Sequence, residues 1–328
     1  MSAVPSTVGL ASSSGAPGLR VQAQCPACSQ LIGPVQDAGS MACSRCGFII
    51  SLVAGIYDAL TPERRKYFSR FISDYEKVRE KEGRGSASAE YYLALPFQDL
   101  SGHNQWQWSI RARTFKYLQR RILPQIEAKC PEADILDIGA GNCWLTYRLA
   151  ARGHHPVAVD LIDNDSDGLG AARHYLARLR RGFPRFSAEM DRLPFAANQF
   201  DAVFFNASLH YSTNYLATLS EAMRCLKRPG YVLIMDSPFY RQQPSGEQMV
   251  KEKREEFQRR YGFPSDSIAS EEFLTREKLA AISRQLGLKL QVKKPWYGVQ
   301  WWLRPLKARL RGKREPAKFY LFWATVEK

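Results

Sequence analysis

The chain lacks any run of 18 or more apolar residues, so we expect no transmembrane helix in its 328 residues. Its first 24 residues have neither an early basic cluster nor an apolar core, which argues against a secretory signal peptide. They are rich in Ser, Ala, Gly and Pro instead, and we expect residues 1–24 to form a disordered tail. No internal repeat recurs at a fixed period, so a repeat architecture is excluded.

Acidic residues are scarce relative to basic ones, with 32 Asp and Glu against 47 Lys and Arg and a net charge of +15. The excess is concentrated at the C-terminus, where ten basic residues oppose two acidic ones between Lys293 and Lys328. Segment 293–318 therefore predicts an anionic partner, which could be membrane headgroups, RNA or a phosphorylated substrate. An apolar helical face opposite basic residues is compatible with a membrane surface or with a packed insertion between two late strands, and it consists of Val299, Trp302, Leu303, Leu306 and Leu310.

Cysteine is infrequent, and an odd total of seven with three isolated thiols is typical of a reducing cytosol. We therefore predict a cytoplasmic protein. The other four cysteines have the spacing C-x2-C-x14-C-x2-C, in which each pair presents two thiolates to a tetrahedral Zn²⁺. All four positions would be filled, so the predicted zinc is structural, and its ligands are Cys25, Cys28, Cys43 and Cys46. Residues 25–60 form this module, which has little core without a metal.

A helical region follows the cysteine module. Thr61 and Pro62 are typical of a helix start, and apolar residues recur at helical spacing from Tyr67 to Val78, which predicts a helix to about Lys81. A second helix is expected over Trp108–Glu127. We interpret residues 61–130 as a helical linker or lid.

Strands and helices alternate from Asp134 onward, which predicts an α/β domain over 131–328 with a mainly parallel sheet and helices on both faces. Helices are expected at 142–152, 167–181, 214–226 and 271–286. The predicted strands are Ile135–Ile138, Pro156–Leu161, Arg185–Glu189, Ala202–Ala207, Tyr231–Asp236, Leu288–Val292 and Phe319–Val326. The last two need not be parallel to the others.

The turn after the first of these strands carries Gly139 and Gly141 and resembles a nucleotide-binding turn. A dinucleotide fingerprint G-x-G-x-x-G would require glycine at position 144, which is Trp144. The indole is too large for the close helix approach of a pyrophosphate site, so a dinucleotide is excluded. A site for S-adenosylmethionine (SAM) needs instead a carboxylate near the turn, a second carboxylate at the end of the next strand, and space beside the backbone for the adenosyl group. Asp137 and Asp160 supply the two carboxylates.

These motifs resemble the class I SAM-dependent methyltransferases of the methyltransferase type 11 kind. The segment Asp137-Ile138-Gly139-Ala140-Gly141 resembles their motif I, and later segments fall in the family's order: Val157–Asp160, Ala188–Phe195, Phe200–His210 and Leu226–Ile234. The family's third glycine is Cys143 here, so we expect the turn geometry to differ at that residue. The resemblance implies a seven-stranded Rossmann-like sheet with an N-terminal zinc-ribbon-like module.

The resemblance also implies a SAM site. Asp160 would accept both ribose hydroxyls, since an ionised carboxylate offers two acceptor oxygens. Asp137 would orient the methionine ammonium, Asp191 would recognise adenine, and Asn206 would lie below the methionine. The predicted SAM-binding residues are Asp137, Gly139, Ala140, Gly141, Asp160, Leu161, Asp191, Arg192 and Asn206.

Methyl transfer requires a general base only if the acceptor must lose a proton early. His210, just after the fourth strand, is the first candidate and Tyr211 the second, although a strand-end histidine is also a common structural hydrogen-bonder. In related methyltransferases N-terminal helices form a lid. The aromatic residues that would line it on the substrate side, or simply pack, are Tyr91, Tyr92, His103 and Trp108.

The acceptor class follows from the end of the fourth strand. The sequence from Asn206 to His210 reads Asn-Ala-Ser-Leu-His, unlike the N/D-P-P-Y/F motif of many nucleic-acid amino methylases. We therefore predict a small-molecule or lipid-linked acceptor, with a location peripheral to a membrane in the lipid-linked case. The alternative is a zinc-containing rRNA or tRNA methyltransferase, since the cysteine module resembles that of bacterial rRNA guanine methyltransferases. A second alternative is a non-catalytic SAM-binding interaction protein, against which intact Asp137, Asp160 and Asp191 argue.

Overall fold

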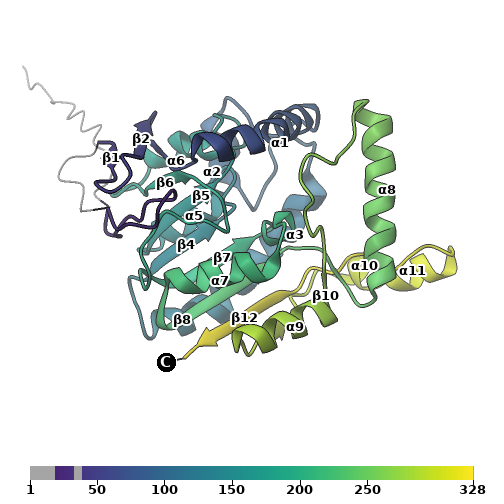
Figure 1. Ribbon diagram of the computed structural model, residues 1–328. Helices are drawn as coiled ribbons and strands as arrows, with labels where there is room; N and C mark the ends of the chain where they lie inside the picture. The colour runs from purple at the N-terminus through teal and green to yellow at the C-terminus, as the bar shows by residue number, and fades with distance from the viewer. Residues whose placement is uncertain (1–18, 33–38, 328) are drawn as a thin grey trace, which may run out of the picture.

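A mainly parallel sheet of seven strands runs through the centre of the described chain, residues 19–32 and 39–327 of a computed structural model (Figure 1). The strand order is β6-β5-β4-β7-β8-β12-β11, and the seven-stranded, mainly parallel sheet confirms the predicted fold class. β12 is antiparallel to both of its neighbours, β8 and β11. These strands span β4 (Asp134–Ile138), β5 (His155–Asp160), β6 (Arg185–Ser187), β7 (Phe200–Asn206), β8 (Leu226–Met235), β11 (Gln291–Lys293) and β12 (Leu321–Val326).

The cysteine module extends this sheet to ten strands instead of standing apart from it. Its strands are β1 (Met41–Ala42), β2 (Ile49–Val53) and β3 (Ile56–Asp58). β3 pairs in parallel with β6, so that Tyr57 lies opposite Phe186, and their rings stack 4.8 Å apart. The module therefore covers the edge of the methyltransferase-like sheet.

The last residues of the predicted disordered tail, 21–24, are ordered in the structure. Residues 1–18 lie outside the described residues, whereas Val21 and Ala23 are buried against the domain. Ala23 pairs with Phe195, and the Gln24 amide donates to the Pro194 carbonyl at 3.0 Å. The assignment of residues 21–24 to a disordered tail is wrong, because Val21 and Ala23 are buried in the same hydrophobic cluster as Phe195.

Helices cover both faces of the sheet (Figure 1). Side chains alternate along each strand, so Leu136 and Ile138 pack on one face with α7 and α9, whereas Ile135 and Asp137 point to the face of α2–α6. The helices are α1 (Pro62–Lys81), α2 (Ala89–Ala94), α3 (Gln105–Tyr117), α4 (Leu123–Glu127), α5 (Trp144–Ala151), α6 (Arg173–Leu176), α7 (Tyr215–Cys225), α8 (Gln243–Tyr261), α9 (Arg276–Leu286), α10 (Val299–Trp302) and α11 (Arg304–Leu310). None of them, within the described residues, is both long and apolar enough to cross a bilayer.

The helix α1 begins where the sequence predicts, with the Thr61 hydroxyl accepting from the Arg64 amide at 3.4 Å. The Arg64 guanidinium forms an ion pair with the buried Glu189 carboxylate, and its Nε donates to both carboxylate oxygens at 2.9 Å. This ion pair anchors the start of α1 to the loop after β6. The rest of α1 then runs over the carboxyl ends of the parallel strands.

The helix α8 has no counterpart in the predictions. Figure 1 shows it at the right-hand end of the molecule, with α10 and α11 at its base. Its Gly246 packs against Phe273, where an added Cβ would lie 2.2 Å from the ring, and no other residue of α8 is buried. The 167–181 prediction is also too long, because the structure has a 3-10 turn (Leu169–Ala172) followed by the short α6. A second sheet pairs β9 (Phe239–Tyr240) with β10 (Leu274–Thr275).

Candidate functional site

A cavity opens at the carboxyl ends of β4, β5 and β7, beneath α1. The turn after β4 forms its floor, and the last residues of β5 and β7 form its sides. Six of the predicted SAM-binding residues line it: Gly139, Ala140, Gly141, Asp160, Leu161 and Asn206. Parallel strands bring their carboxyl ends to one edge, and this is the usual ligand position in such folds.

The turn after β4 requires glycine at its first position. Gly139 has φ +75°, and a Cβ there would lie 2.2 Å from Cβ of Ser208. Ser208 in turn donates to the Ile138 carbonyl at 2.5 Å and so fixes the approach of the two loops. Cys143 has φ +63° and takes the left-handed conformation that a glycine would adopt, at a cost of about 1 kcal/mol. The turn thus keeps a glycine-like path with a cysteine in it.

Asp160 is held firmly at the mouth of this cavity. Its carboxylate accepts from the Gly141 amide at 2.7 Å and from the Ile162 amide at 2.9 Å. Burial raises the pKa of Asp160, and these two amide donors oppose the rise. Each oxygen keeps a free lone pair, so the oriented carboxylate can accept two further hydrogen bonds from a ligand.

Three of the predicted SAM-binding residues lie away from the cavity. Asp137 is buried on the α5 side of the sheet, where its Oδ2 accepts from the Thr146 hydroxyl at 2.6 Å. It occupies a strand position that faces away from the ligand edge. Asp191 and Arg192 do not line the cavity either, and the residue before them, Met190, does.

The burial of Asp137 predicts a pH-dependent stability. Burial raises its pKa to about 7, so the folded chain holds this proton more tightly than the unfolded chain. The stability associated with the protonated carboxyl is complete below the unfolded pKa near 4 and is lost as the pH rises through 7. The variant Asp137→Asn keeps an acceptor for Thr146, so its stability gain over the unchanged protein should grow by roughly 2 kcal/mol between pH 5 and pH 8. Urea unfolding at the two pH values measures this.

A matched control for that experiment is Asp165→Asn, because the Asp165 side chain is 78% exposed. This variant should show no comparable growth of stability with pH. A gain for Asp137→Asn that is equal at both pH values would contradict a buried, protonated Asp137.

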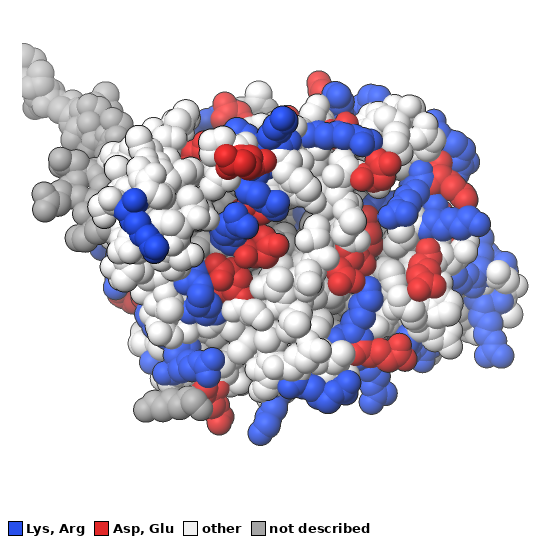
Figure 2. All heavy atoms as spheres, in the orientation of Figure 1, with Lys and Arg blue, Asp and Glu red and all other residues white. Residues whose placement is uncertain are grey.

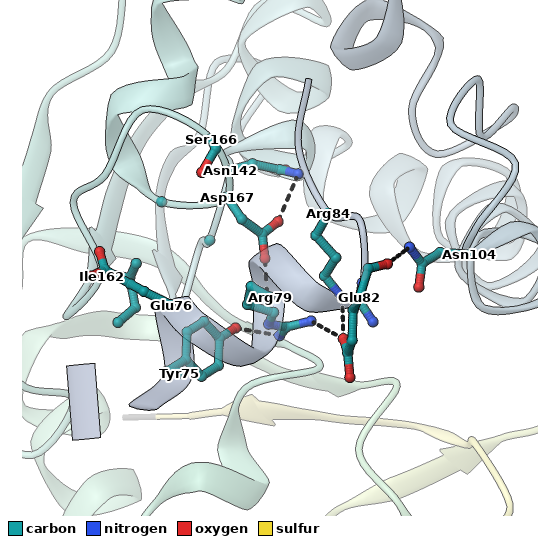
Figure 3. A network of polar contacts seen from close by, with 12 residues as sticks. Tyr75, Glu76, Arg79, Glu82, Arg84, Asn104, Asn142, Ile162, Ser166 and Asp167 are labelled. Carbon is teal, nitrogen blue, oxygen red and sulfur yellow. Dashed lines mark hydrogen bonds and ion pairs between the residues drawn. The ribbon is translucent and has the colours of Figure 1, made fainter. Parts of the chain in front are cut away.

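The helix α1 reaches into the cavity through Arg79, which sequence reasoning missed. Figure 3 shows its guanidinium between Asp167 and Glu82, with Nε 3.4 Å from Asp167 Oδ2 and Nη1 3.8 Å from Glu82 Oε2. The same guanidinium lies 4.4 Å from the centre of the Tyr75 ring. Asn142 donates to Asp167 at 3.5 Å, so the network joins α1 to the loops after β4 and β5. Arg79 follows Tyr75 by four residues, and this position within the predicted apolar stripe was the available signal.

A second cavity adjoins the first. The residues common to both are Phe71, Tyr75, Arg79, Arg84, Arg111, Ala207 and Tyr211. Beyond them the second cavity is bounded by α3, α8 and α10 and by Phe319. Tyr211 therefore lies at the junction of the two cavities, whereas His210 lines only the second cavity.

His210 is held in its neutral form. Burial lowers its pKa to about 3, and the charges of Lys253, Arg111 and Arg79 lower it further. Its Nδ1 lies 3.4 Å from the Ser237 hydroxyl, and its ring lies 4.4 Å from that of Tyr211. At neutral pH the imidazole is thus uncharged, and the side chain lines the second cavity.

The predicted substrate-side aromatics do not line either cavity. The Tyr92 hydroxyl donates to the Ser166 carbonyl at 2.6 Å, and its ring stacks on His174. Trp108 is buried edge-on against Trp144, Tyr91 is buried beside Tyr92, and His103 is exposed. Tyr91, Tyr92 and Trp108 instead pack α2 and α3 against the domain. The same helix, α3, supplies other residues to the second cavity, namely Trp106, Gln107, Ile110 and Arg111.

The four cysteines of the module converge. Their sulfur atoms all lie within 4.8 Å of one another, with Cys25 and Cys46 3.5 Å apart and Cys28 and Cys43 3.6 Å apart. A tetrahedral Zn²⁺ with Zn–S bonds of about 2.3 Å requires sulfur separations of about 3.8 Å. The donor set and its spacing therefore fit a zinc ion with no open position.

Comparison with known proteins identifies the central region. Residues 136–234 match the family of the methyltransferase domain. This central region is a methyltransferase domain. The methyltransferase YodH of Bacillus subtilis, itself described as uncharacterized, is 30% identical over 123 residues, 38% of this chain and 51% of that protein. The ubiquinone/menaquinone biosynthesis C-methyltransferase UbiE of Rhizobium johnstonii is 31% identical over 111 residues, 33% of this chain and 43% of that protein.

The methyltransferase domain also has neighbours among solved structures. A 1,6-didemethyltoxoflavin-N1-methyltransferase of Burkholderia thailandensis aligns over 88% of this chain and 100% of its own, with 15% identity and a TM-score of 0.47. The chain spans about half or less of the length of the curated relatives above.

Proposed function

We propose that the protein transfers a methyl group from SAM in the first cavity to a small-molecule or lipid-linked acceptor in the second. The observation that carries this proposal is that the two cavities share a wall. Tyr211, Arg79 and Arg111 face both of them, so the donor and the acceptor would meet at this junction.

The first cavity offers the groups that SAM requires. Asp160 would hold the ribose hydroxyls, and the apolar side chains of Ile162, Ala188 and Met190 would contact the adenine. Three arginines line the cavity and would bind the methionine carboxylate, a role for Arg79, Arg84 and Arg111. When bound, SAM supplies a methyl group activated on a sulfonium sulfur.

The second cavity supports an acceptor with an aromatic or apolar body and a polar group. Its walls include Trp106, Phe257 and Trp301, together with the cations Lys253 and Arg304. Such a mixture suits a ring-bearing molecule. The relative UbiE is named as a C-methyltransferase of ubiquinone/menaquinone biosynthesis, which supports an acceptor of the small-molecule or lipid-linked class.

The residues of this chain would act chiefly by alignment and exclusion of water. The contact of Arg79 with Asp167 holds α1 over the cavity. His210 would accept a proton from the acceptor, and Tyr211 would orient the acceptor, because both side chains line the second cavity. We also infer that the four-cysteine cluster binds a structural Zn²⁺ that stabilises the module.

His210→Ala tests the proposed base. The variant should lower kcat by about 10²-fold or more, the usual range for a positioned base. Its Kd for SAM should stay within about threefold of the unchanged value, because His210 does not line the first cavity. Initial rates and calorimetric SAM titration measure the two quantities. The control is His155→Ala, because His155 lies at the amino end of β5, away from the cavities at the carboxyl ends of the strands. This variant should change neither kcat nor the Kd for SAM. Unchanged turnover of His210→Ala would remove this histidine from the mechanism.

The acceptor class is tested with the purified chain, tritium-labelled SAM and a cell extract separated into RNA, lipid and small-molecule fractions. We expect label in the lipid or small-molecule fraction. Label confined to RNA would favour the RNA methyltransferase, and calorimetric SAM binding without label in any fraction would favour a non-catalytic SAM-binding protein.

A further inference from the structure

The segment between β11 and β12 presents an unpartnered apolar face. The helices α10 and α11 carry exposed side chains at intervals of three, four and four residues, which places them on one side of the helical segment. Their exposed fractions are 61% for Val299, 67% for Trp302, 54% for Leu306 and 77% for Leu310. Trp296, just before α10, is 64% exposed. Six of the thirteen exposed large hydrophobic residues of the described chain fall between Val292 and Leu310, whereas the others are scattered, so this patch is concentrated.

Cations surround this face. The segment from Lys293 to Lys318 holds nine basic residues and a single acidic one, Glu315. Arg314 pairs with Glu252 and Lys318 pairs with Glu315. Four exposed cations of α11 and the following turn have no ion-pair partner within the described residues: Lys307, Arg309, Arg311 and Lys313. Figure 2 shows blue side chains along the right edge of the molecule, where Figure 1 draws α8 and α11.

The opposite side of the same helices lines the second cavity. Trp301 and Arg304 face that cavity, and the Arg304 guanidinium lies 3.9 Å from the centre of the Trp301 ring. Trp301 also packs against Phe319, with ring centres 5.5 Å apart. One side of this helical pair is therefore a wall of the acceptor cavity and the other side is exposed.

We propose that α10 and α11 dock the protein onto an anionic lipid bilayer, with Trp296, Trp302, Leu306 and Leu310 in the interfacial layer and the four unpaired cations against the headgroups. Tryptophan and leucine beside lysine and arginine are typical of interfacial helices. Aliphatic leucines offer nothing to a phosphodiester backbone or to a stacked base, so the face suits lipid better than RNA. The inference deepens the proposed function, because it places the acceptor cavity at the surface where a lipid-linked acceptor resides.

The test is sedimentation of the full chain with lipid vesicles, without SAM or acceptor. Vesicles of phosphatidylcholine alone are compared with vesicles that also contain phosphatidylglycerol. We expect at least about tenfold tighter binding to the anionic vesicles, and a blue shift of tryptophan emission upon binding. Leu306→Ser with Leu310→Ser should weaken this binding at least about tenfold, and Lys307→Glu with Arg311→Glu should weaken it similarly.

Matched controls carry the same chemistry elsewhere on the surface. Ile49→Ser with Val53→Ser removes two exposed apolar residues, and Arg178→Glu with Arg180→Glu makes the same charge change. Neither should alter vesicle binding. Thermal unfolding checks that each variant is folded.

No binding to anionic vesicles, or equal binding by the leucine variant, would overturn the docking surface. Retention by an RNA oligonucleotide but not by vesicles would overturn it as well. Because SAM and acceptor are absent, such a failure leaves the proposed methyl transfer untouched. The failure of methyl transfer alone would equally leave vesicle binding in place.

Discussion

Asp160→Asn should raise the Kd for SAM by about 100-fold or more. Two charge-assisted hydrogen bonds to the ribose hydroxyls would each contribute about 1.5–3 kcal/mol, and the amide side chain replaces one acceptor oxygen with a donor. The Asp160 carboxylate is already oriented by the Gly141 and Ile162 amides, so its acceptor geometry is in place before a ligand arrives. Calorimetric titration with SAM measures the effect.

The control for Asp160 is Asp163→Asn, a nearby carboxylate in the same loop that lines neither cavity. Its SAM affinity should be unchanged. Thermal unfolding of both variants separates lost binding from lost folding, because Asp160→Asn also weakens two backbone contacts. A folded Asp160→Asn variant that binds SAM within about threefold of the unchanged protein would remove the ribose role of this residue.

Loss of the zinc ion should destabilise the SAM site as well as the module. Cys25 and Cys43 belong to the same buried cluster as Tyr57, Phe186 and Phe195. The coupling runs along the sheet, since Ser187 lies opposite Asp58 of the module on one side and opposite Asp160 on the other. We expect Cys25→Ala with Cys43→Ala to lower Tm by about 10 °C and to weaken SAM binding.

Elemental analysis should find one zinc per unchanged chain and none in this variant. Cys130→Ser replaces an isolated, partly buried thiol and should keep both the zinc and the Tm. A chain prepared without zinc that melts at the same temperature and binds SAM equally well would contradict the structural role of the metal.

The sequence predicted the elements whose apolar pattern is strong. The strands β4, β5 and β7 and the helices α5, α7 and α9 lie within a few residues of their expected positions, except that α9 starts five residues later than expected. The helix α8 was missed because its nineteen residues are largely polar and only Gly246 is buried, which leaves no apolar period to detect. The pairing of β3 with β6 could not be predicted, since each strand has only three residues and they lie more than a hundred residues apart.

The sequence predicted those residues of the candidate site whose positions follow from a strand end or a tight turn. Gly139 and Asp160 line the cavity because a strand end and a tight turn fix them. Asp137 was expected there from its motif, but strand alternation turns it to the α5 face. Arg79 and Arg111 reach the cavity only through the way α1 and α3 lie across the sheet, which local sequence does not specify.

The pairing of β3 with β6 also bears on how the protein is made. The module ends near residue 60, and its partner strand, Arg185–Ser187, is synthesised about 125 residues later. At roughly 5–20 residues per second, the module waits on the order of ten seconds on the ribosome before the edge that it completes exists. During that interval a zinc ion bound by the four cysteines would be the main source of the module's stability, so metal binding would come before the pairing of β3 with β6. The supply of zinc during translation would then limit the yield of folded protein.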